Sequence, residues 1–140
     1  MGAIGSPIIV GYVDSAEGQA ALDRAIVEAQ QRSARLVVIN SHKGGAAYDK
    51  TMAAAAEESL ADVRARLDEA GVEYEVRQLV RGEDPADDII HVAEEVDADL
   101  IVIGLRRRTP VGKLILGSNA QRVLLDAECP VLAVKSPQES

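Results

Sequence analysis

A short basic segment is the part of this sequence whose residue types could bind a small anion. Residues 104–125 contain five of the chain's fifteen Lys and Arg residues and none of its twenty-three Asp and Glu, although the whole chain has a net charge of −8. Such a local reversal of sign raises the concentration of small anions nearby. The segment includes Gly117, Ser118 and Asn119, directly before an apolar helical pattern. Because the first backbone N–H groups of a helix have no partner within it, this arrangement predicts a phosphate-binding loop.

The elements that would position this loop alternate as in a parallel α/β fold. Short apolar runs predict buried strands, and a run of alternating polarity predicts a half-exposed one, at residues 7–13, 36–39, 72–80, 100–104 and 130–135. Caps and apolar periodicity predict helices after Asp14 or Ser15 and at about residues 48–70, 85–96 and 118–126. We therefore expect one domain over residues 1–140, with 136–140 as a tail. Its fold would be a single-domain, open, parallel five-stranded sheet with helices on both faces, of Rossmann-like type.

This fold predicts where a ligand would bind. In open parallel sheets, ligands occupy the crevice beyond the carboxyl ends of the strands, where the strand order reverses. Asp14 follows the first predicted strand and Gly104 ends the fourth. We therefore expect both residues to lie at the site. The residues after the second predicted strand, 40–45, are polar and glycine-rich, which indicates a flexible connection.

Composition excludes several classes of function. The chain has three Tyr, no Phe and no Trp, and its pI is near 4.7, which disfavours nucleic-acid binding because that needs broad basic surfaces and often stacking rings. A single cysteine, Cys129, fits a reducing compartment. No apolar run approaches the length of a membrane span, and the N-terminus lacks a signal-peptide pattern. We expect a cytoplasmic protein with no membrane partner.

Residue spacing provides no catalytic triad, acid pair or metal site. His42 and His91 are not spaced as paired metal ligands, and Cys129 has no nearby base, so we interpret it as a structural thiol. The acidic pair Asp87–Asp88 lies on a predicted helix, and we interpret it, like the other acidic pairs, as a solvated face. We therefore expect neither catalytic nor metal-binding residues.

On these residues the chain resembles the universal stress protein family. Nucleotide-binding members carry Gly-x2-Gly-x9-Gly-[Ser/Thr] after the fourth strand, and the corresponding positions here are Gly104, Arg107, Gly117 and Ser118. The resemblance covers nearly the whole chain. Its other matching segments are Asp14–Ser15, Gly82 to Pro85, residues 97–104 and Cys129–Leu132.

The resemblance implies the adenine nucleotide alpha hydrolase-like form of the fold and a regulator or sensor of the stress response. Its ligand would be ATP, or ADP or AMP, with or without Mg²⁺, and it would not be an enzyme beyond slow ATP hydrolysis. Asp14 would contact the adenine or ribose, Tyr12 and Ser41 would lie near the base, and Gly104 would line the pocket floor. The expected nucleotide-binding residues are Tyr12, Asp14, Ser41, Ile103, Gly104, Arg106, Arg107, Gly117, Ser118 and Asn119.

The chain departs from the family motif at Arg107, where the second glycine is expected. Arg107 could fill the phosphate space, which would make the chain a nucleotide-free protein-interaction module of the same fold. Alternatively, Arg106, Arg107 and Arg108 could hold phosphate oxygens by charge-assisted hydrogen bonds. The lack of acidic residues in 104–125 favours the second alternative, although the three arginines could also be a solvated loop surface.

The resemblance also implies a homodimer that pairs residues 131–135 of two copies. The run from Val131 to Val134 is apolar and carries no charge until Lys135, as expected of an edge strand that pairs with the same strand of a second copy. The protein partner of a stress regulator is not encoded in any motif here. An ATP-dependent enzyme of the wider fold group is disfavoured because the Ser-Gly-Gly-x-Asp-Ser loop and the His-x-Gly-His signature are missing.

Overall fold

Strands and helices alternate along the whole described part of the chain. The computed structural model describes residues 5–13, 15–42, 50–80, 84–106 and 117–136. The strands are β1 (Gly5–Gly11), β2 (Ala34–His42), β3 (Tyr74–Val80), β4 (Leu100–Leu105) and β5 (Val131–Lys135). The helices are α1 (Ala16–Arg32), α2 (Lys50–Ala70), α3 (Pro85–Glu95) and α4 (Ser118–Asp126).

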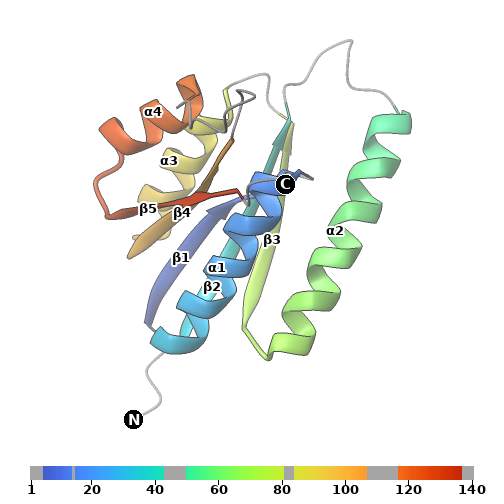
Figure 1. Cartoon of the computed structure of the whole chain (residues 1–140), viewed down its shortest axis with the longest axis horizontal. Helices are drawn as coiled ribbons and strands as arrows, with labels where there is room; N and C mark the ends of the chain where they lie inside the picture. The colour runs from blue at the N-terminus through green and yellow to red at the C-terminus, as the bar shows by residue number, and fades with distance from the viewer. Residues whose placement is uncertain (1–4, 14, 43–49, 81–83, 107–116, 137–140) are drawn as a thin grey trace.

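The five strands form one parallel sheet in the order β3-β2-β1-β4-β5. Ile8 of β1 lies opposite Leu36 of β2 on one side and Leu100 of β4 on the other. The chain therefore builds outward from β1 in one direction, returns, and builds outward in the other (Figure 1). This confirms the predicted open parallel sheet, with its reversal of strand order between β1 and β4.

Helices cover both faces of the sheet, and each face has its own apolar cluster. Ile8 and Val10 of β1 pack with residues of α1 and α2, whereas Ile9 packs with residues of α3 and α4. All three side chains are fully buried. Because successive strand residues point to opposite faces, a strand covered on both faces must be apolar at every position, which explains the continuous run in the sequence.

Local signals set most helix ends as the sequence predicts. Ser15 caps α1, where its Oγ accepts a hydrogen bond of 3.2 Å from the N–H of Gly18. Gly71, directly after α2, has a φ of 71°, a left-handed conformation that glycine adopts without steric cost. Pro85 begins α3, and Asp84, at the N-cap position before it, makes no side-chain capping hydrogen bond.

Strand β2 extends further than the sequence pattern indicates. Asn40, Ser41 and His42, which we expected in a flexible connection, continue the strand and pair in register with residues 78–80 of β3. The reason is that ladder hydrogen bonds join backbone groups, so a strand can continue through polar side chains where its neighbour continues alongside. This extension places Ser41 within the sheet instead of in a loop.

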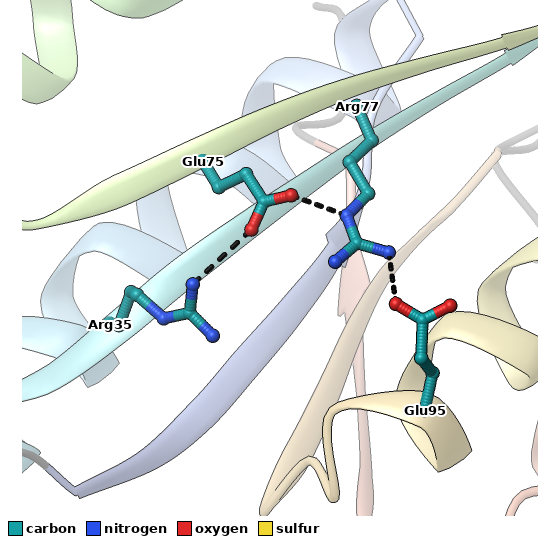
Figure 2. A network of polar contacts seen from close by, with 4 residues as sticks. All are labelled: Arg35, Glu75, Arg77 and Glu95. Atoms are coloured by element: carbon teal, nitrogen blue, oxygen red, sulfur yellow. Dashed lines mark hydrogen bonds and ion pairs between the residues drawn. The ribbon is translucent and has the colours of Figure 1, made fainter.

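An ion-pair network attaches the edge strand β3 to β2 and α3 (Figure 2). Glu75 accepts hydrogen bonds from Arg35 at 3.2 Å and from Arg77 at 2.5 Å, and Arg77 also donates to Glu95 at the end of α3 at 2.7 Å. The two carboxylates raise the pKa of Arg77. Tyr74 and Val76, which alternate with these charges, are half-buried against the α1–α2 cluster. The alternating polarity of this segment therefore reflects one packed and one ion-paired face.

Candidate functional site

A cavity of about 290 Å³ opens where β1, β2 and β4 end. Its walls come from the last residues of these strands and from the first turns of α1, α3 and α4. Its apolar lining includes Ile39, Ile89, Ile103, Leu105 and Val123. The cavity therefore lies at the reversal of strand order, the position in which open α/β sheets bind ligands.

Eight of the ten residues expected at a nucleotide site line this single cavity. They are Tyr12, Ser41, Ile103, Gly104, Arg106, Gly117, Ser118 and Asn119. The other two, Asp14 and Arg107, lie outside the described residues. Folding thus brings together residues from the ends of three strands and the start of α4, which are far apart in the sequence.

The three helix N-termini at the cavity differ in charge. The first turn of α1 contains Glu17, and the first turn of α3 contains Asp87 and Asp88. The first turn of α4 contains no acidic residue, and Gly117 has no side chain to cap it. In its first intrahelical hydrogen bond, the N–H of Gln121 donates to the carbonyl oxygen of Gly117. The three preceding N–H groups, of residues 118–120, therefore have no partner within the helix. Of the three helix starts, α4 is the one whose partial positive charge is best placed for an anion.

Arg106 brings a cation to the lining of the cavity, where it is paired with Glu17. Its Nε donates a hydrogen bond of 3.2 Å to Oε1 of Glu17, and both residues line the cavity. The Arg106 side chain is 56% exposed and that of Glu17 only 13%. Burial raises the pKa of Glu17, but hydrogen bonds to a backbone N–H, to Ser15 and to Arg106 outweigh it and lower the pKa. Glu17 is therefore a carboxylate that holds an exposed cation beside the cavity.

Sequence reasoning missed Glu17 as a cavity residue. The available signal was its place in the first turn of a helix that follows a strand end, next to the predicted site residue Asp14. The contact with Arg106 spans 89 positions, which no local pattern reports.

Two glycines let the first turn of α1 approach the ends of β1 and β4. A Cβ on Gly104 would lie closer than 3.0 Å to the backbone carbonyl oxygen of Glu17, and one on Gly18 equally close to that of Val13. Gly117 differs, because a Cβ there would meet no atom of the described residues within 4 Å. Packing at the cavity thus requires a glycine at position 104, whereas no described residue requires one at position 117.

Asp88 corrects the interpretation of the pair Asp87–Asp88 as a solvated face. Asp88 is 1% exposed, and the hydroxyl of Ser41 donates a hydrogen bond to its Oδ2. Helical periodicity places it with Pro85 and Val92 on one side of α3, and its hydrogen bond to Ser41 shows that this side faces β2. Pro85 lines the cavity. Oδ1 of Asp88 has no hydrogen-bond partner among the described residues.

Tyr12 and Asn119 border the cavity, but their polar atoms also bind elsewhere in the protein. The Tyr12 ring is buried in the α1–α2 cluster, and its hydroxyl is hydrogen bonded to Ser59 at 3.2 Å and to Gln19 at 2.8 Å. Oδ1 of Asn119 accepts from the N–H of Ala86 at 3.4 Å, so it supplies part of the cap that Asp84 does not. These two residues therefore connect the cavity to the packing of the helices around it.

Metal ligands, the single cysteine and membrane-spanning helices add no second site in the described part of the chain. No group of three His, Cys, Asp or Glu residues there is placed to hold a metal ion. Cys129 is half-buried, and burial raises the pKa of its thiol, which disfavours the nucleophilic thiolate. Within the described ranges, no helix combines the length and apolar character that crossing a bilayer requires.

The fold and the cavity define the chain as a Rossmann-like α/β domain with a ligand-sized cavity at its switch point. Residues 6–135 match the model of the universal stress protein family. A universal stress protein of Mycolicibacterium smegmatis is 46% identical over 128 residues, which cover 91% of this chain and 96% of that protein. The chain therefore belongs to the universal stress protein family.

Solved structures of the family agree with the fold. The structure of a universal stress protein from Archaeoglobus fulgidus is 41% identical, with a TM-score of 0.80, and the match covers 94% of this chain and 100% of that one. A structure of the universal stress protein from Archaeoglobus fulgidus in complex with dAMP is 36% identical, with a TM-score of 0.75, and covers 95% and 100%.

Proposed function

We propose that this universal stress protein binds an adenine nucleotide, ATP, ADP or AMP, in the cavity between β1 and β4 and acts as a sensor or regulator. The observation that carries the proposal is that eight residues expected at such a site line one cavity, which also receives the acid-free N-terminus of α4. The relative in complex with dAMP supports the choice of an adenine nucleotide.

The charges of the cavity favour one orientation of the nucleotide. Arg106 and the first turn of α4 are the sources of positive potential in the described lining, so the phosphates would lie beside them. At the end of β2, Ser41 lies among the apolar side chains of Ile39, Pro85 and Ile89. A flat base would bury apolar surface there, while the hydroxyl provides a hydrogen-bond partner.

Calorimetric titration with ATP, ADP and AMP, each with and without Mg²⁺, tests the proposal. We expect saturable heat for at least one of the three nucleotides, with weaker binding when Arg106 is replaced by alanine. The exposed Arg24 on α1, which lies outside the cavity, offers a matched control, because Arg24→Ala removes the same charge. No heat at millimolar nucleotide, with or without Mg²⁺, would overturn the proposal.

A second function, a nucleotide-free protein-interaction module, is favoured by one specific observation. Arg106 is already paired with Glu17, so a cation expected to meet phosphate has a partner within the chain. Release of nucleotide on heating freshly purified protein, followed by chromatography, distinguishes the two functions. Nucleotide in the supernatant at near-stoichiometric amounts supports binding, and a nucleotide-free supernatant together with silent titrations supports the interaction module.

We further propose that the regulator is a homodimer joined through β5, Val131–Lys135. Among the described strands β5 pairs only with β4, and its residues 131–134 are half-buried. A second copy of the strand would pair the free edge and cover these side chains. Light scattering at micromolar concentration should give twice the chain mass, and a monomeric mass would contradict the dimer.

A further inference from the structure

Asp88 is a buried carboxylate that binding at the cavity does not by itself explain. It is 1% exposed, and its hydrogen-bond partner is the hydroxyl of Ser41, with Oδ1 unpartnered among the described residues. A buried carboxylate with an unsatisfied oxygen costs stability, so its presence needs a reason. The reason we find is its effect on Ser41, which lines the cavity.

We propose that Asp88 is a positioning residue that makes the Ser41 hydroxyl a hydrogen-bond acceptor and thereby selects purines with an amine at the six-position. The proposal rests on the proposed nucleotide site and specifies which base that site accepts. AMP, whose six-position carries an amine, would be preferred over IMP, whose six-position carries a carbonyl oxygen.

The role of Asp88 follows from the number of protons that Ser41 and Asp88 can donate. A hydroxyl has one proton and two lone pairs, and a carboxylate can accept hydrogen bonds but cannot donate them. Because the Ser41 proton is donated to Oδ2 of Asp88, Ser41 can offer the cavity only lone pairs. An amine N–H can donate to these lone pairs, whereas a carbonyl oxygen would face another acceptor.

The surroundings of Ser41 prevent the pair from rearranging easily. Ser41 lies within the parallel ladder, opposite Leu79 of β3, so its backbone is held by the sheet. Asp88 is held on α3 between the cavity residues Pro85 and Ile89. A polar group fixed by its scaffold discriminates between ligands better than one that can turn to suit each of them.

Parallel titrations of the full chain with AMP and IMP test the proposal. We expect AMP to bind about threefold to tenfold more tightly than IMP, the range of one neutral hydrogen bond. Equal affinities would overturn the assignment while leaving the nucleotide site intact. Absence of binding by either nucleotide would overturn both the site and the assignment.

Variants separate positioning from a structural role. Asp88→Ala should bring the affinity ratio of AMP to IMP towards one by raising the affinity for IMP, because the freed hydroxyl can then donate to a carbonyl. A merely structural defect would not strengthen binding of either nucleotide. Ser41→Ala should also bring the ratio towards one, here by weakening AMP, and it tests the assignment even if Asp88→Ala fails to fold.

A double variant and a charge control complete the test. Adding Asp88→Ala to Ser41→Ala should leave the AMP to IMP affinity ratio the same as in Ser41→Ala alone, because Asp88 acts through Ser41. Asp87→Asn removes a neighbouring carboxylate that pairs with Arg122 outside the cavity, so it should keep the ratio of the unaltered protein. A ratio unaffected by Ser41→Ala would overturn the proposal.

Discussion

Glu17 and Asp88, two acidic side chains in the first turns of helices, affect the same cavity in different ways. Glu17 lies beside an exposed guanidinium, whereas Asp88 is enclosed and bound to a neutral hydroxyl. The carboxylate at Glu17 therefore adjusts the charge that a phosphate would meet. The carboxylate at Asp88 adjusts the direction of a hydrogen bond. Their surroundings, and not their residue type, set these effects.

The Glu17–Arg106 pair predicts how nucleotide affinity responds to charge. Glu17→Gln should strengthen ATP binding by about twofold to fivefold, because it releases Arg106 and removes a like charge near the phosphates. Calorimetric titration measures the change, and the exposed Glu94→Gln on α3 is the control for net charge. Weaker binding by Glu17→Gln would mean that Glu17 contacts the ligand directly and that the ion pair does not compete with it.

The same pair predicts a pH dependence of stability. The pKa of Glu17 is lowered below 4.5 in the folded protein, so its ionised form is stabilised by folding. The stability that it contributes is present above about pH 4.5 and is lost as the pH falls through the lowered pKa. Urea unfolding should show the free-energy advantage of the unaltered chain over Glu17→Gln shrinking in that acidic range. An advantage that grows on acidification would contradict this assignment.

The start of each helix at the cavity is set by how closely it approaches the sheet. The first turn of α1 packs so tightly on β4 that Gly104 has no room for a side chain, whereas a side chain on Gly117, at the start of α4, would contact none of the described residues. Helix α3 receives part of its cap from Asn119 of α4. The cavity is thus bounded by one tightly packed helix and by two that support each other.

Replacing each of these two glycines by alanine should change the stability of the protein by different amounts. Gly104→Ala should destabilise the protein by about 1–3 kcal/mol, because the new methyl group would overlap the Glu17 carbonyl and push α1 from β4. Gly117→Ala, with a φ of −70°, should change stability by less than about 1 kcal/mol. Thermal or urea unfolding of both variants measures the contrast. Similar losses in the two would show that the close approach at Gly104 does not limit packing.

At the scale of the whole molecule, the cavity lies between the two halves of the sheet, strands β3-β2-β1 and strands β4-β5. Its lining includes residues of β1 and β2 on one side of the reversal and of β4 on the other, with helices from both faces. A ligand bound there would contact elements that otherwise meet only through the pairing of β1 with β4 and through helix packing. Binding should therefore stabilise the fold as a unit.

Ligand-dependent unfolding follows from this arrangement. AMP at a hundred times its dissociation constant should raise the free energy of unfolding by about 2.7 kcal/mol. Urea unfolding followed by circular dichroism measures the shift, with inorganic phosphate at the same concentration as the control for ionic effects. An equal shift with phosphate alone would show that the stabilisation does not need the nucleoside.

The sequence by itself determined the order and type of the elements and the segments that form the cavity. The bounds of α4, Ser118–Asp126, agree with those predicted, and the apolar runs became the buried strands. These features follow from local patterns, because side-chain period, caps and turn residues act within a few positions. The strand-end rule predicted Gly104 at the site, and the family resemblance added Ser41 and Gly117. All three line the cavity.

Only the tertiary structure decided which polar atoms meet. The hydrogen bond of Ser41 to Asp88 joins residues 47 positions apart, and that of Arg106 to Glu17 joins residues 89 apart. A local pattern marks Asp88 as one of two adjacent acids on a helix, and only the packing of α3 against β2 buries Asp88 and leaves Asp87 half-exposed. The physical reason is that burial and hydrogen-bond partners are properties of the space between elements, which forms only after the elements have packed.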